Sequence, residues 1–182
     1  CGGALILAAA AGLKLASLYR HDRTVAKAVA SLTLPAGAKA RLLPGPIPGT
    51  AGYEVDLGSF PSSRPCNRTC VISGLPTDTG NVMLYMRVPH REDRDHTAST
   101  AVMTASLRVG DRKVALASKI ADMTAMSGWP DPEHDYLYVW PAPHVRLAPN
   151  EGPVEVEFQY SPGESDAIDG SIDLLISSGG TK

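Results

Sequence analysis

The sequence has few cysteines and no block of like charge, and each of these two shortages excludes a class of protein. Three of its residues are Cys, so a scaffold held together by many disulfides is excluded. Aromatic residues are also few, because only 5% of the chain is Phe, Trp or Tyr. The net charge is −2 and the pI is near 6.2. Because nucleic-acid-binding proteins concentrate basic residues on one face, we expect no nucleic-acid partner.

Common catalytic and nucleotide-binding motifs are also missing. The chain has no G-x-S-x-G nucleophile elbow, no H-E-x-x-H zinc motif, no phosphate-binding loop and no dinucleotide-binding fingerprint. Its five histidines stand outside any hydrolase or metalloprotease pattern. We therefore expect no catalytic residue, no cofactor and no resident metal, and we expect that the protein is not an enzyme.

Residues 1–19 form the one long apolar run, with Lys14 as its only charged side chain. A helix rises about 1.5 Å per residue, so this run reaches roughly 28 Å, close to the hydrocarbon thickness of a bilayer. Lys14 lies near the end of the run, where its ammonium can extend to the headgroups, and Tyr19 is an aromatic of the interfacial type. The run predicts an uncleaved membrane anchor.

Three other interpretations of this run stay open. It can be a cleavable signal peptide with the small residues 8–10 before the cut, a lipidated N-terminus at Cys1, or a buried helix of a soluble domain. Arg20, Arg23 and Lys27 follow the run and, taken alone, favour a cytoplasmic position for what comes next. The state of the cysteines bears on this orientation.

Cys66 and Cys70 lie four residues apart in a turn-like stretch that follows Pro65. We expect them to close a small disulfide loop, because two nearby thiols oxidise in an exported domain. A zinc site that adds His90 and His96 is one alternative, and two free thiols are the other.

The next segments differ in composition. Residues 24–32 have apolar side chains at helical spacing and end before Pro35, which predicts a helical stalk that continues the anchor. Residues 35–52 are rich in Pro and Gly, a composition that favours extended, semi-rigid backbone. We therefore divide the chain into an anchor with its stalk (1–34), a spacer (35–52) and a folded domain (53–182).

Short β-rich runs separated by turn residues fill the domain. Alternating or β-branched patterns predict strands at residues 53–57, 82–88, 101–109, 112–117, 136–140, 154–160 and 171–176. Gly110-Asp111 is a favoured two-residue hairpin turn between two of them. Residues 119–126 are ambiguous between a short helix and an irregular crossover. About seven or eight short strands predict a mainly β fold, an antiparallel β-sandwich.

Two charged loops are candidates for contact with a partner. Residues 90–96 mix basic and acidic side chains, and residues 129–136 place carboxylates and prolines around His134. Mixed charges in a loop can steer a partner of complementary pattern. The residues that we expect at such a contact are Arg91, Asp93, Arg94, Trp129, Asp131, Glu133 and His134.

Some of the same residues admit other functions. A histidine beside carboxylates can act as a general base, so His134 is the candidate centre of a hydrolase. Trp129 and Trp140, with Tyr136 and Tyr138, can form a platform on which sugar rings stack. The acidic residues Glu164, Asp166, Asp169 and Asp173 form a loose calcium-type cluster without the spacing of an EF-hand loop.

The C-terminal third of the chain carries a resemblance to known proteins. Residues 145–158, VRLAPNEGPVEVEF, are followed by an acidic loop and by the apolar residues 172–176. This arrangement resembles the final hairpin of small exported bacterial β-sandwich proteins, many of them lipoproteins and some of them immunity proteins. The resemblance implies a β-sandwich outside the cytoplasm and, for the immunity type, neutralisation of a toxin delivered to the periplasm.

These observations together predict a protein anchored in the bacterial inner membrane with its β-sandwich in the periplasm. We expect it to bind a protein partner without turnover, and an immunity-type role is one version of that function. A carbohydrate- or cell-wall-binding module is the first alternative, and a hydrolase centred on His134 is the second.

Overall fold

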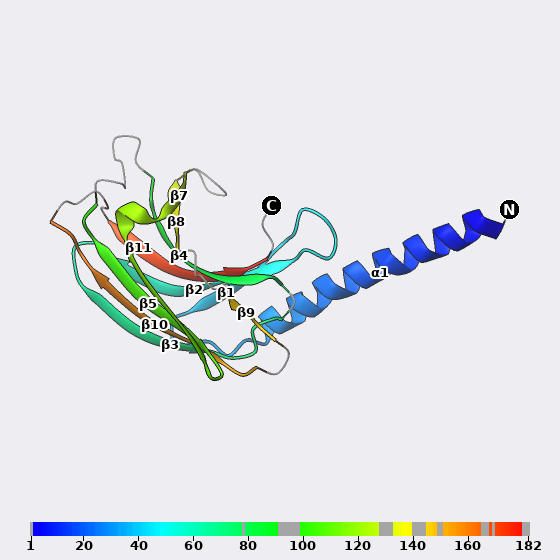
Figure 1. Cartoon of the computed structure of the whole chain (residues 1–182), viewed down its shortest axis with the longest axis horizontal. Coiled ribbons are helices and arrows are strands. Elements are labelled where there is room, and N and C mark those ends of the chain that lie inside the picture. The colour runs from blue at the N-terminus through cyan, green and yellow to red at the C-terminus, as the bar shows by residue number, and fades with distance from the viewer. Residues whose placement is uncertain are drawn as a thin grey trace.

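A computed structural model describes residues 2–77, 79–90, 99–127, 133–139, 145–148, 151–164, 168 and 170–179. It shows two antiparallel sheets packed face to face and one long helix that projects from them (Figure 1). The predicted β-sandwich is confirmed.

Helix α1 spans Gly2–Ala30, and one 3-10 turn, η2, spans Ile120–Asp122. The strands that the structure describes are β1 (Lys39–Leu43), β2 (Gly52–Pro61), β3 (Cys66–Ile72), β4 (Asn81–Pro89), β5 (Val102–Val109), β6 (Arg112–Lys119), β7 (Thr124–Ser127), β8 (His134–Val139), β9 (Val145–Arg146), β10 (Val154–Ser161) and β11 (Ser171–Ser178). The seven-stranded sheet has the order β1-β2-β11-β4-β8-β7, with β9 paired to β4. The four-stranded sheet has the order β3-β10-β5-β6.

Every strand that the sequence predicts is present, as β2, β4, β5, β6, β8, β10 and β11. The Gly110-Asp111 turn joins β5 to β6 as predicted, and Gly110 has a positive φ of 56°. The ambiguous range 119–126 holds η2 and the start of β7. The prediction missed β1, β3, β7 and β9, which are short or lie in stretches that read as turns.

Strand β10 lies inside the four-stranded sheet, between β3 and β5. Its alternating sequence turns Val154, Val156, Phe158 and Tyr160 inward, each at most 3% exposed. The rings of Phe158 and Tyr160 pack against Phe60 of β2, with centroids 5.5 and 5.1 Å apart. These contacts between the two sheets form the centre of the hydrophobic core.

Arg68 of β3 links the two sheets along one edge of the sandwich. Its guanidinium donates to the carbonyl oxygen of Leu57 at 2.9 Å and to that of Ser59, both in β2, and lies 5.9 Å from the centre of the Phe60 ring. Strand β1 pairs with β2 only as far as Asp56. Arg68 thus binds carbonyls that lie beyond the end of β1, and an inward-pointing charge on an edge strand also discourages pairing with a second chain.

A bulge in β2 makes room for this contact. The register with β11 shifts between Asp173 and Leu175, opposite Leu57 and Gly58. Gly58 has a φ of 99°, and a Cβ at this position would lie 2.9 Å from Nη1 of Arg68. Glycine is therefore required here by its backbone conformation and by the close approach of the guanidinium.

The C-terminal half of α1 is fastened to the sandwich. The Asp22 carboxylate accepts the backbone N–H of Gly49 at 2.9 Å and that of Ala51 at 3.0 Å. These hydrogen bonds, the one from Gly49 above all, hold the pKa of Asp22 below its usual value. One turn further along, Val25 is 2% exposed and Val29 packs against the core. The loop before β2 and the helix therefore hold each other in place.

Residues 24–30 of the predicted stalk are helical, because α1 continues without a break through residue 30, but Val25 and Val29 pack against the sandwich. The predicted spacer at residues 35–52 contains β1, whose pairing with β2 makes residues 39–43 part of the seven-stranded sheet. Over the residues described, no helix has an apolar stretch long enough to cross a membrane.

We predict that Gly58→Ala destabilises the protein more than Gly37→Ala. Both glycines have positive φ, 99° and 83°, but nothing lies within 4 Å of a Cβ added at residue 37. The shared backbone cost is about 1 kcal/mol, and displacement of Arg68 adds about 1–2 kcal/mol at Gly58 only. Urea unfolding of the two variants measures the difference, and equal losses would show that Arg68 gives way freely.

Candidate functional site

The outer face of the four-stranded sheet carries a hollow of about 420 Å³, which we call the β10 trough. Gln159 of β10 lies opposite Asn67 of β3 and Thr104 of β5. One pair further along, Glu157 lies opposite Thr69 and Ser106. The side chains that line the trough are Asn67, Thr69, Thr104, Ser106, Lys113, Ala115, Glu157 and Gln159.

The charges in the trough are paired. The Oε2 atom of Glu157 accepts Lys113 Nζ at 2.7 Å and Ser106 Oγ at 2.8 Å. These two donors, Lys113 first, hold the pKa of Glu157 below its usual value, so the carboxylate stays ionised at neutral pH. With one lysine against one glutamate, the lining side chains have no net charge.

The uncharged lining groups suit the binding of a polar ligand. Asn67, Thr69, Thr104 and Gln159 are exposed, and carboxamides and hydroxyls both donate and accept hydrogen bonds. With strands spaced about 4.8 Å apart, four strands give the trough a span of roughly 14 Å. Because the side chains stand on paired strands, the surface is formed before any ligand arrives. No histidine or cysteine lies among its lining residues.

A second polar group, the Glu54 cluster, lies on the outer face of the seven-stranded sheet. Glu54 of β2 is 5% exposed. Its carboxylate accepts Arg41 Nε of β1 at 2.7 Å and the hydroxyl of Tyr85 of β4. Tyr85 packs against Tyr136 and Tyr138 of β8, with ring centroids 5.9 and 5.0 Å apart. Burial, followed by the nearby Glu54, raises the pKa of the Tyr85 hydroxyl, which therefore remains a hydrogen-bond donor.

Arg87 of β4 and Asp173 of β11 pair on the same sheet. Nε and Nη2 of Arg87 donate to Asp173 Oδ2 at 2.8 and 2.5 Å, and Ser59 Oγ donates to Oδ1 at 2.6 Å. Asp173 is one of the acidic residues considered for calcium, and here it holds an ion pair. Two others, Asp166 and Asp169, lie outside the described residues. Within the described ranges, no three His, Cys, Asp or Glu side chains converge as metal ligands.

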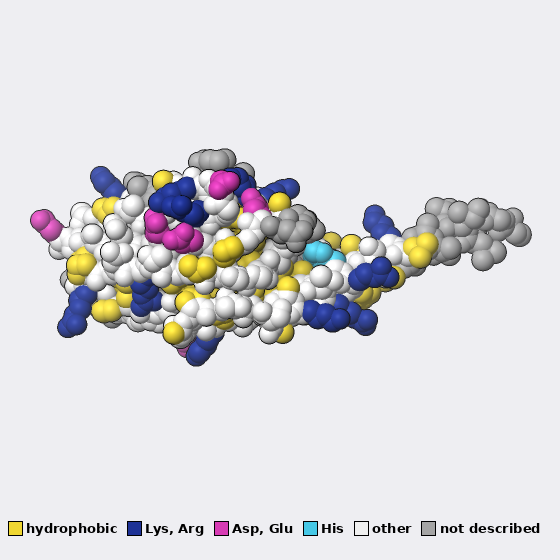
Figure 2. Space-filling view, turned by 90° about the horizontal axis from the view of Figure 1, so that it is seen from below, with side chains coloured by type: hydrophobic (Ala, Val, Ile, Leu, Met, Phe, Trp, Pro, Cys, Tyr) yellow, Lys and Arg dark blue, Asp and Glu magenta, His cyan; other side chains and the backbone are white. Residues whose placement is uncertain are grey.

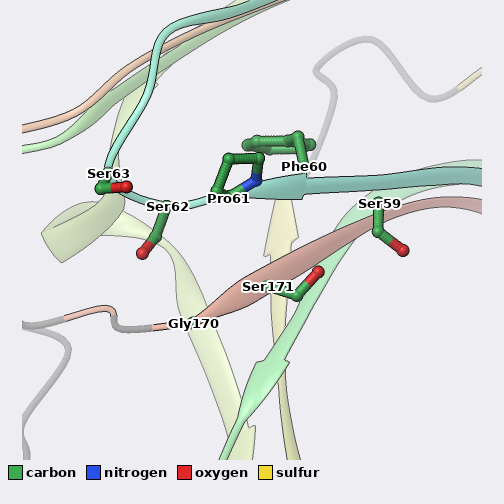
Figure 3. A pocket seen from close by; sticks show the side chains of 7 residues that line it. All are labelled: Ser59, Phe60, Pro61, Ser62, Ser63, Gly170 and Ser171. Atoms are coloured by element: carbon green, nitrogen blue, oxygen red, sulfur yellow. The ribbon is translucent and has the colours of Figure 1, made fainter.

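A wider hollow, of about 520 Å³, lies where β2 ends and β11 begins (Figure 3). Its hydroxyl groups point in different directions, as Figure 3 shows. The residues that line it are Ser59, Phe60, Pro61, Ser62, Ser63, Gly170 and Ser171. We call it the serine hollow. None of its lining residues is a histidine or a carboxylate that could activate a serine as nucleophile.

The predicted disulfide between Cys66 and Cys70 is wrong. Both cysteines are free, and both belong to β3. Four residues of strand separate their Cα atoms by roughly 13 Å, whereas a disulfide requires about 7 Å or less. The stretch after Pro65 is an edge strand, and alternation turns both thiols toward the core side. Burial raises the pKa of the Cys70 thiol, which is 8% exposed.

The residues predicted to contact a partner are only partly placed by the structure. Glu133 is exposed and His134, the first residue of β8, is half-buried. Arg91, Asp93, Arg94, Trp129 and Asp131 lie outside the described residues, as do Trp140 and His96. A protein partner, a periplasmic location and a membrane anchor therefore stay predictions.

Strand alternation separates His134 from the carboxylate that follows it. Asp135 is 2% exposed, and its Oδ1 atom lies 2.9 Å from Nδ1 of the His90 ring. The His90 backbone N–H donates to the carbonyl of Glu133 at 2.8 Å. Adjacent residues on a strand face opposite sides, and the Asp135 carboxylate pairs with His90. A hydrolase centred on His134 stays an alternative prediction.

No protein-family model matches this sequence, and no curated protein matches it. Among solved structures, the family 11 carbohydrate-binding module of the cellulosomal cellulase Lic26A-Cel5E of Clostridium thermocellum aligns with a TM-score of 0.28 and 11% identity. The alignment covers 84% of this chain and 88% of that one. The class defined by the structure, a β-sandwich, rests on the two sheets of this chain.

Sequence reasoning missed the β10 trough and the Glu54 cluster. A signal for the trough was present, because Glu155, Glu157 and Gln159 alternate with apolar residues and must face away from the core. The residues beside them on β3 and β5 could not be found without the strand pairing. Glu54 and Tyr85 are 31 residues apart in the chain, and nothing local connects them.

We predict that Tyr85→Phe lowers the free energy of unfolding by about 1–3 kcal/mol, because it removes a donor from a buried carboxylate. Tyr19→Phe is the matched control, since Tyr19 is 52% exposed on α1, and it should change stability by less than about 0.5 kcal/mol. Chemical denaturation measures both. Equal small effects would mean that the Tyr85 hydroxyl does not stabilise Glu54.

We predict that Cys66 and Cys70 both titrate as thiols without reductant. In a Cys1→Ser background the half-buried Cys66 should react first with a thiol reagent, and the buried Cys70 should react fully only after unfolding. Mass spectrometry of the unreduced protein provides the check. A mass lower by two hydrogens, restored by reductant, would contradict the prediction.

Proposed function

We propose that the chain is a non-catalytic binding module whose β10 trough takes a neutral, polyhydroxylated ligand, such as a segment of polysaccharide. The observation that carries the proposal is the charge-balanced array of exposed carboxamide and hydroxyl groups on β3, β10 and β5. Hydroxyl groups of a sugar both donate and accept, so they can pair with every one of these side chains.

The chemistry of the trough disfavours other ligand classes. Because Glu157 is paired with Lys113, the lining side chains offer no net charge that would attract a phosphate or a free cation. Apolar ligands find only Ala115 and the methyl groups of two threonines. A neutral ligand rich in hydrogen-bonding groups is what remains.

The trough has no aromatic side chain among its lining residues. Affinity would therefore rest on hydrogen bonds, each of which contributes about 1 kcal/mol net. The lining side chains stand on hydrogen-bonded strands, which limits the conformational entropy lost on binding. We therefore expect a moderate affinity for the ligand, to which several side chains contribute at once. The alternative sugar platform of Trp129 and Trp140 lies outside the described residues.

We predict that soluble polysaccharides bind the full chain saturably and that Asn67→Ala and Gln159→Ala each weaken binding about three- to tenfold. Ala115→Arg, which fills the trough from an exposed position on β6, should abolish binding while leaving the unfolding transition unchanged. Affinity electrophoresis over a panel of neutral and acidic glycans, followed by calorimetry on the best ligand, measures these effects.

Ser63→Ala is the matched control, because Ser63 is an exposed polar residue of the serine hollow. It should leave glycan binding unchanged. Loss of binding in Ser63→Ala with normal binding in Ala115→Arg would move the site to the serine hollow. Absence of saturable binding to every glycan in the panel would refute the proposed function.

A further inference from the structure

The exposed face of α1 near the sandwich is basic, and it lies away from the residues that fasten the helix. Leu18 contacts Gly49, Asp22 binds the same loop, and Val25 is buried, so these positions face the sandwich. At 3.6 residues per turn, Arg20, Arg23 and Lys27 fall on the opposite side, and all three are exposed. We call these three residues the basic collar.

Nothing in the described part of the chain neutralises the collar. Asp22 is the one acidic residue in α1, and its carboxylate is occupied by the N–H groups of Gly49 and Ala51. Figure 2 shows Lys and Arg side chains along the helix where it leaves the sandwich, with no Asp or Glu among them on the face in view. The collar therefore presents a positive potential to whatever lies beside the helix.

Exposed apolar side chains lie beside the collar. On α1, Leu13, Leu15 and Tyr19 are 75, 53 and 52% exposed. We call these three residues the apolar rim. Leu13 is the most exposed large hydrophobic side chain among the described residues.

We infer that the basic collar and the apolar rim together dock on an anionic phospholipid bilayer. Cations that pair with lipid phosphates, next to aliphatic and aromatic side chains that enter the headgroup region, are the composition of an interfacial membrane site. A nucleic acid or an acidic protein would use the cations and leave the apolar rim in water. The sequence of residues 2–12, the first part of α1, is uncharged and apolar.

The Asp22 contacts give this docking a structural consequence. Because they fasten the helix to the sandwich on the face opposite the collar, the helix and the sandwich meet the bilayer as one unit. The sandwich is then held in a fixed orientation relative to the membrane. Glycan binding in the β10 trough does not depend on this docking, so the two proposals can fail separately.

The test is co-sedimentation of the full chain with vesicles of phosphatidylcholine alone and of phosphatidylcholine mixed with phosphatidylglycerol. The wild-type chain should partition more strongly to the anionic vesicles, by about fivefold for each engaged cation, and the preference should fall as salt is added. In the triple variant Arg20→Gln, Arg23→Gln, Lys27→Gln, the preference for anionic vesicles should fall roughly 100-fold. Gln maintains helix propensity, and circular dichroism confirms folding.

Two matched controls separate the surface from net charge and from general hydrophobicity. Arg64→Gln, Arg108→Gln, Lys119→Gln removes three exposed charges elsewhere and should leave the preference nearly unchanged. Leu13→Gln, at a 75% exposed position on α1, should weaken partition severalfold, whereas Val71→Ser, at a 48% exposed position on β3, should not. Equal losses in both triple variants, equal partition to neutral and anionic vesicles, or binding to heparin or polyglutamate without binding to vesicles would each overturn the inference.

Discussion

The pairing of β10 with β3 on one side and β5 on the other is the constraint on which both faces of the four-stranded sheet depend. Strand alternation leaves no freedom once this pairing is set, because each residue of β10 must face either the core or solvent. Val154, Val156, Phe158 and Tyr160 therefore form the inner face, and Glu155, Glu157 and Gln159 form the outer one. Strand β10 therefore contributes its inward side chains to the core and its outward side chains to the β10 trough.

The charged side chains of Arg68 and Glu54, inside the sandwich and on a covered face of it, are held by partners that shape the edges of the molecule. Arg68 binds two carbonyl oxygens of β2 and requires Gly58 beside it. Glu54 binds Arg41 and Tyr85. A buried charge that loses its partner costs several kcal/mol, so these contacts set the positions of β1, β2 and β4 relative to one another.

The attachment of α1 shows the same logic at the surface. Asp22 could have reduced the positive charge of the helix, but its carboxylate is used to hold the loop at Gly49 and Ala51. The cations on the opposite face of the helix remain available to a partner. One local contact therefore decides both how the helix is mounted and what chemistry its exposed face presents.

The sequence by itself determined which long segments are strands and which of their residues face inward. The period-2 patterns of residues 53–57 and 154–160 and the Gly110-Asp111 turn depend only on near neighbours, and the helix through residue 30 follows from apolar spacing and a following proline. Local patterns failed where pairing overrode them. The stretch with Cys66 and Cys70 has the composition of a turn after Pro65, but in the structure it is strand β3 and pairs with β10. Only the tertiary structure decided that the two thiols lie apart, that Asp135 meets His90, that Glu54 meets Tyr85, and that Asn67 and Thr104 stand beside Gln159. Each of these depends on which strands pair and in what register, and that choice is made by contacts between residues far apart in the chain.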